Sequence, residues 1–116
     1  MTETADTTEN AVTVRRADAE NRYEIRVDGE LAGFTAYRDR GDQRVFYHTE
    51  IAEAFGGRGL SGVLVGQALT DVRESGRTAV PVCPLVAAYL RKHPEYADIA
   101  RPVEPAILSW LDTELG

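Results

Sequence analysis

The stretch F-G-G-R-G-L-S-G, residues 55–62, divides the chain into two parts with different hydrophobic periodicity. Ahead of it apolar and polar residues alternate, as in half-buried strands, and behind it apolar residues recur at helical spacing. Four of its eight residues are glycine, which adopts positive φ readily and lets the backbone approach a ligand closely. A helix that begins here presents unpaired amides, so this glycine loop predicts an anion site, most naturally for a phosphate.

Upstream of the glycine loop, the sequence predicts four strands in an antiparallel meander. Asp28-Gly29 is typical of a two-residue hairpin, and Gly41-Asp42 lies in a second turn. Alternation of apolar and polar residues places the strands around 12–14, 23–27, 30–38 and 44–51.

Downstream of the loop, the period changes to that of a helix. We expect about four helical turns from Leu60 to a stop at Ser75-Gly76. The residues expected on its buried stripe are Leu60, Val63, Leu64, Gln67, Ala68, Leu69 and Val72. A short strand over 78–82 follows, then a helix over 85–93 that Pro94 ends.

A last amphipathic segment covers 103–115 and is interrupted early by Pro105. Strand, glycine loop, helix and strand together form a right-handed crossover. The predicted fold class is therefore α+β: an antiparallel meander, extended by one parallel strand into a mixed sheet, with helices packed on the sheet. Ligands bind such sheets at the carboxyl ends of strands where the order changes, which is where the glycine loop lies.

Length and composition indicate one soluble domain over 11–101, with a disordered acidic tail at 1–10 and a helical extension at 102–116. The formal net charge of −6 argues against a general nucleic-acid binder. No apolar run approaches the roughly 18 residues of a membrane span, and the acidic N-terminus is unlike a signal peptide, so we expect a cytoplasmic protein. The single cysteine, Cys83, excludes an internal disulfide and a cysteine-rich zinc site, and we expect no metal.

Three further stretches accompany the glycine loop: H-T-E-I at 48–51, V-P-V-C-P at 80–84 and R-K-H-P-E-Y at 91–96. Together, over about residues 22–100, they resemble the small single-domain branch of the GNAT acetyltransferase superfamily. The resemblance implies a GNAT-like fold, acetyl-CoA as cofactor, and transfer of an acetyl group to an amine. Because this branch is too short for the helices that enclose the acceptor in longer relatives, it implies an open acceptor site for a peptide, protein or small amine.

The superfamily's phosphate loop reads Gln or Arg, any, any, Gly, any, Gly or Ala, and falls on residues 56–61. Gly56 and Ser61 depart from that pattern, so we expect binding to rest on backbone amides from about Arg58 to Gly62. The cofactor-binding residues implied by the resemblance are Ile51, Gly56, Gly57, Arg58, Gly59, Leu60, Ser61, Gly62 and Lys92. For Lys92 and its neighbour Arg91, ordinary surface charge is the alternative.

Two residues are candidates for chemistry from their own position. Cys83 ends a strand directly before a helix, where free amides favour a thiolate; it is a candidate nucleophile, a lining residue or a small buried hydrophobe. Histidine exchanges protons near neutral pH, so His48 is a candidate general base, with Glu50 on the same strand face as a second candidate. Which strand face meets the cleft depends on any bulge.

The resemblance adds further roles. It implies that Tyr89 protonates the coenzyme A thiolate, although a tyrosine in this helix is otherwise core, and that a strand amide near 49–51 polarises the thioester carbonyl. It also implies direct attack by the amine, with a covalent route through Cys83 second.

Two other classes of function stay open: a non-catalytic coenzyme A or acyl-CoA-binding module, and a small protein-interaction domain. We expect a monomer or a weak homodimer, with Trp110 and Leu111 of the C-terminal segment as a candidate dimer seam.

Overall fold

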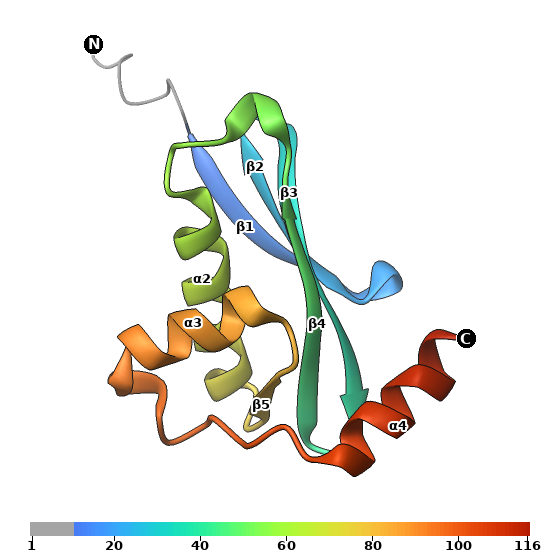
Figure 1. Ribbon diagram of the computed structural model, residues 1–116. Helices are drawn as coiled ribbons and strands as arrows, with labels where there is room; N and C mark the ends of the chain where they lie inside the picture. The colour runs from blue at the N-terminus through green and yellow to red at the C-terminus, as the bar shows by residue number, and fades with distance from the viewer. Residues whose placement is uncertain (1–10) are drawn as a thin grey trace, which may run out of the picture.

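The computed structural model describes residues 11–116, so the predicted tail at 1–10 lies outside the described residues. The chain forms one mixed sheet with strand order β1-β2-β3-β4-β5, in which β1 to β4 are antiparallel and β5 runs parallel to β4 (Figure 1). The strands are β1 (Val12–Ala17), β2 (Arg22–Val27), β3 (Glu30–Arg40), β4 (Gln43–Ile51) and β5 (Thr78–Pro81). The predicted meander and its parallel extension are confirmed, and with them the α+β class.

Three helices pack on this sheet, and α2 connects β4 to β5 as the crossover predicts. They are α2 (Leu60–Glu74), α3 (Pro84–Lys92) and α4 (Pro105–Leu115). Single 3-10 turns lie at η1 (Asp18–Glu20), η2 (Glu53–Phe55) and η3 (Pro94–Tyr96). Among residues 11–116, every helix is too short or too polar to cross a lipid bilayer.

The buried stripe of α2 differs from the predicted one. Val63 and Gln67 are exposed, whereas Val65 is buried. At 3.6 residues per turn, the buried residues share one arc of the helix and the two exposed ones fall outside it. The buried arc consists of Leu60, Leu64, Val65, Ala68, Leu69 and Val72.

The two faces of the sheet are covered differently, and Figure 1 shows α2 and α3 on one side of β4 and α4 on the other. We call the face under α2 and α3 the inner face; it carries the larger core, with side chains such as Ile25 and Phe46. The opposite, outer face is covered only where α4 lies. There Ile107 and Leu111 of α4 pack on Val45 and Val80.

Two expectations about the C-terminal segment are therefore wrong. Pro105 does not interrupt the helix but begins it, since the first helical position needs no amide donor. Leu111 is buried within the chain, and the Trp110 ring packs beside it with the Arg40 guanidinium 5.9 Å from the ring centroid. Leu111 therefore does not present the predicted dimer seam, and a seam that includes the partly buried Trp110 stays a prediction.

Two irregularities of β4 shape the sheet. Ala36 pairs with His48 but Tyr37 pairs with Phe46, which leaves Tyr47 as the extra residue of a β-bulge. The pairing of β4 with β5 ends at Phe46 opposite Pro81. Residues 47–51 of β4 thus have a neighbour strand on only one side.

A buried guanidinium holds the end of the sheet away from the glycine loop. Arg44 is 4% exposed, and its Nε and Nη2 donate to the two carboxylate oxygens of Asp39 at 2.8 and 3.0 Å. Its Nη1 donates to the Tyr23 hydroxyl at 2.7 Å, and that hydroxyl donates to Asp71 of α2. Burial, and then the bond to Asp71, raise the pKa of Tyr23, which keeps the hydroxyl a donor. Four elements are tied together by this one side chain.

We expect Arg44→Met to lower the free energy of unfolding by about 3 kcal/mol, because it leaves Asp39 and the Tyr23 hydroxyl without their partner. Urea denaturation followed by circular dichroism measures the change. Arg15→Gln is the control: Arg15 is an exposed strand arginine without a hydrogen bond among residues 11–116, and its loss should change the free energy by less than about 0.5 kcal/mol. Equal unfolding midpoints for the two variants would contradict this account.

Candidate functional site

The glycine loop lies between η2 and α2 and presents its backbone to open space. Gly57 and Gly59 have φ of 76° and 71°, and Gly59 is the N-cap residue of α2, with no side chain capping the helix. Among residues 11–116, no acceptor pairs with the amides of residues 57–59, and the first amides of α2 are free by helix geometry. A Cβ placed on Gly57, Gly59 or Gly62 would meet no atom within 4 Å. The loop therefore fits a phosphate group held by main-chain donors.

Cys83 lies where β4 and β5 part. Its amide donates a hydrogen bond to the Phe46 carbonyl at 2.8 Å, which is the last backbone hydrogen bond to β4 on the β5 side. Cys83 is buried, with 4% of its surface exposed. Its Sγ lies 3.4 Å from the Thr49 hydroxyl, which is 2.8 Å from the hydroxyl of Thr35. The thiol does not cap α3 although Cys83 occupies the N-cap position. Cys83 is thus a buried thiol whose one hydrogen-bond partner among the described residues is the Thr49 hydroxyl on the inner face.

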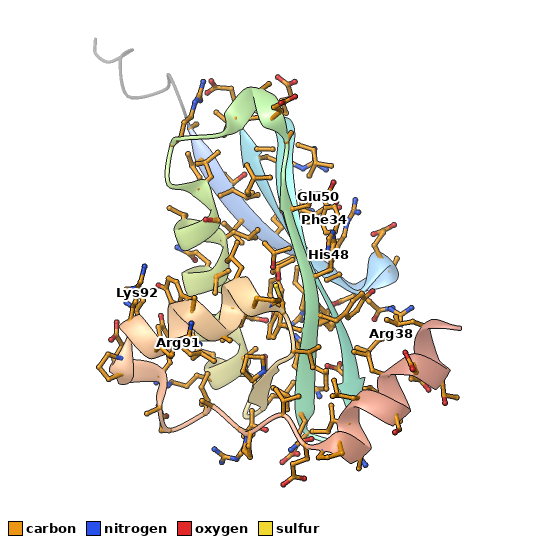
Figure 2. The ribbon with its side chains drawn as sticks, viewed as in Figure 1. Phe34, Arg38, His48, Glu50, Arg91 and Lys92 are labelled. Carbon is orange, nitrogen blue, oxygen red and sulfur yellow. The ribbon has the colours of Figure 1, made fainter. Side chains whose placement is uncertain are left out.

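His48 and Glu50 lie together on the outer face (Figure 2). His48 Nε2 is 3.2 Å from Glu50 Oε1, and the two side chains are 56% and 62% exposed. The ring of Phe34, whose residue pairs with Glu50 across β3 and β4, is 5.9 Å from the His48 ring. His48 and Cys83 therefore occupy opposite faces of β4, beside the edge that β5 leaves free.

The bulge at Tyr47 decides this arrangement. Phe46 faces the inner core and Tyr47 packs against α4 on the outer face, so strict alternation would return His48 to the inner face. Because two consecutive residues of the bulge share the outer face, His48 stays outside and Thr49 turns toward Cys83.

Tyr89 lies in a groove between α2 and α3. Its ring stacks on His93 at 3.9 Å between centroids, and its hydroxyl lies so near Gly66 that an added Cβ there would be 2.6 Å away. Burial, followed by the nearby Tyr96 and Glu95, raises the pKa of Tyr89. The phenol is therefore a neutral proton donor at physiological pH. No contact joins it to Cys83 among the described interactions.

The remaining predicted residues lie in several parts of the structure. Ile51 is partly buried against the inner core, and the Arg58 guanidinium lies 5.4 Å from the Phe55 ring centroid. Arg91 and Lys92 are exposed in the last turn of α3, at the end opposite Cys83 (Figure 2). Cations there complement the helix dipole, so their part in cofactor binding stays a prediction.

Sequence reasoning missed the hydroxyls of Thr35 and Thr49 and the ring of Phe34. They could have been found from the pairing register of the β3–β4 hairpin. Phe34 opposite Glu50 and Thr35 opposite Thr49 are register pairs of β3 and β4, but counting from the turn at 41–42 finds them only if the extra residue at 47 is included.

Comparisons with known proteins bear on this fold and site. A family model described as GCN5-related N-acetyl-transferase matches residues 22–99. The solution NMR structure of a GCN5-like protein from Staphylococcus aureus superposes with a TM-score of 0.61 at 20% sequence identity, covering 80% of this chain and 91% of that one. At this identity the likeness concerns the fold. A search of curated proteins gave no match.

The family match spans β2 to the turn after η3, and so includes the glycine loop, the free edge of β4 and Cys83. The chain belongs to the GCN5-related N-acetyltransferase family.

Proposed function

We propose that this protein is an acetyl-CoA-dependent N-acetyltransferase that moves an acetyl group to an amine by direct attack. The observation that carries the proposal is the row of unpaired amides at the start of α2, in a chain of this family. These amides, from Gly57 to Gly62, would hold the pyrophosphate of the coenzyme. Lys92 and Arg91 are candidates for its other phosphate.

Acetyl-CoA supplies an activated acetyl group: a bond from the amine nitrogen to the carbonyl carbon forms as the carbon–sulfur bond breaks and the sulfur leaves as a thiolate. The free edge of β4 offers backbone amides within 49–51 that polarise the carbonyl. His48, hydrogen-bonded to Glu50, accepts the proton that the amine loses. The neutral Tyr89 phenol supplies the proton that the thiolate takes up.

Cys83 fits the role of a lining residue better than that of a nucleophile. Its side chain is buried, and its near partner is a hydroxyl rather than a general base. The candidate base His48 lies on the other face of the strand. In the covalent route the thiol and this base would lie on opposite faces of the strand.

Binding of acetyl-CoA tests the role of the glycine loop. Isothermal titration of the wild type with acetyl-CoA should show one site, and Gly59→Ala should raise the Kd about tenfold, because an alanine strains the positive φ and moves the amides by which the phosphates are held. Gly76→Ala is a matched control, since Gly76 also has positive φ (73°) and open space but follows α2 instead of preceding it.

Gly76→Ala should leave the Kd unchanged within about twofold. Absence of heat and of any thermal shift at millimolar acetyl-CoA would contradict the proposed function. Equal loss of affinity in both variants would show that the loop acts only through stability.

Replacement of Cys83 tests the choice between direct attack and the covalent route. Direct attack predicts that Cys83→Ala retains kcat/KM within about threefold, once its unfolding free energy is taken into account, because only packing around the thiol is lost. Intact-mass measurement of quenched wild-type reactions should show no acetyl adduct. An adduct that Cys83→Ala lacks, together with loss of turnover, would establish the covalent route instead.

A further inference from the structure

Arg38 is a partly buried cation without a partner. Among residues 11–116, no hydrogen bond, ion pair or ring contact involves its guanidinium. The N–H donors of this guanidinium are therefore available to an anionic ligand. The other buried or partly buried arginines all donate hydrogen bonds within the chain: Arg22, Arg26, Arg44 and Arg77.

Arg38 lies on the same face of the sheet as the pair formed by His48 and Glu50. Arg38 is two residues, about 7 Å, along β3 from Ala36, and Ala36 pairs with His48 on the neighbouring strand. Figure 2 shows Arg38 on the same side of the sheet as Phe34, His48 and Glu50. Arg38 itself pairs with Val45, which α4 covers, so α4 bounds the outer face just beyond the guanidinium.

The opposite end of this surface is apolar. A hollow there is lined by Leu31, Phe34 and Ala52, together with Glu50. The outer face thus presents, in order along β3, an apolar hollow, a carboxylate with its histidine, and an unpaired guanidinium. Arg22 and Arg26 of the neighbouring strand β2 both pair with Glu24, and the Arg22 guanidinium also lies 4.7 Å from the Phe34 ring centroid, so both are already engaged within the chain.

We propose that the acceptor is an amine that also carries an anionic oxygen group, such as a carboxylate or a phosphoryl group, which Arg38 binds while the amine faces His48 and Glu50. The inference rests on the proposed acetyl transfer at this site. A polyamine, or any acceptor whose second group is cationic, would be repelled by Arg38 at this spacing. Arginine offers a carboxylate or phosphoryl group two parallel donors, so Arg38 selects the acceptor by the anionic group at the end opposite its amine.

The test compares acceptors that differ only in the far group: n-butylamine, 4-aminobutyrate and 3-aminopropylphosphonate. With acetyl-CoA in excess, release of coenzyme A should give a kcat/KM for at least one anionic amine about tenfold above that for n-butylamine. Chemical-shift titration of the full chain with the same compounds measures the preference without turnover. Whichever anionic amine is preferred identifies the group that Arg38 binds.

Arg38→Gln should bring the ratio of anionic to neutral amine close to one, while the affinity for acetyl-CoA is unchanged. Arg15→Gln is the matched control, because Arg15 is on the same face, pairs with Glu24 in the strand register, and lies two strands away from Arg38. It should keep the wild-type ratio.

Equal affinity and equal kcat/KM for the neutral and anionic amines in the wild type would overturn the inference and leave the transferase intact. So would a preference that Arg38→Gln leaves unaltered. Failure of acetyl-CoA to bind, with an Arg38-dependent preference for the anionic amine preserved, would instead overturn the proposed function and keep the anion site.

Discussion

The site depends on where one set of hydrogen bonds stops. β4 and β5 pair as far as Phe46 and Pro81, and the amide of Cys83 makes the last bond to β4. Beyond that point β4 continues for five residues, 47–51, with one side unpaired. Unpaired strand edges are ordinarily a liability, because they can bind other chains. Here the edge lies beside α3 and leads toward the glycine loop, and it is where we propose that acetyl transfer takes place.

The end of the sheet away from the glycine loop is held by many contacts, and these compensate for the unpaired edge of β4. Arg44 connects β4 to β3, β2 and α2 through Asp39, Tyr23 and Asp71, and α4 packs over Val45 and Val80 on the other face. Burial and charge-assisted hydrogen bonds are thus concentrated away from the glycine loop. The loop and the free edge contribute few such contacts. This division is consistent with a rigid frame that presents a less constrained site.

Local patterns were sufficient for most of the fold, because strands and helices have periods that can be read within one segment. The Asp28-Gly29 hairpin, the helix after the glycine loop and the crossover to β5 were all predicted in this way. Pro105 was misread because a proline inside an apolar pattern is compatible with either a break or a first turn. The burial of Leu111 depends on a sheet face that the segment itself does not specify.

The site itself was predictable only in part. The glycine loop, Cys83 and His48 stand out by residue type, but the face on which His48 lies is set by a single extra residue at Tyr47. A bulge leaves no clear mark in one strand's sequence, since it exists only relative to the partner strand. The hydroxyl pair of Thr35 and Thr49 and the unpaired state of Arg38 likewise depend on contacts between segments.

The exposure of the outer face also has a consequence for the acceptor selection that we propose. His48 and Glu50 are more than half exposed, so any charge that they or Arg38 present to an incoming molecule is surrounded by water and dissolved ions. At an ionic strength of about 0.1 M, such fields decay over roughly 10 Å. Attraction toward this face therefore acts only at short range, and recognition is sensitive to salt, in contrast to the enclosed pocket of an enzyme that shields its charges behind a lid.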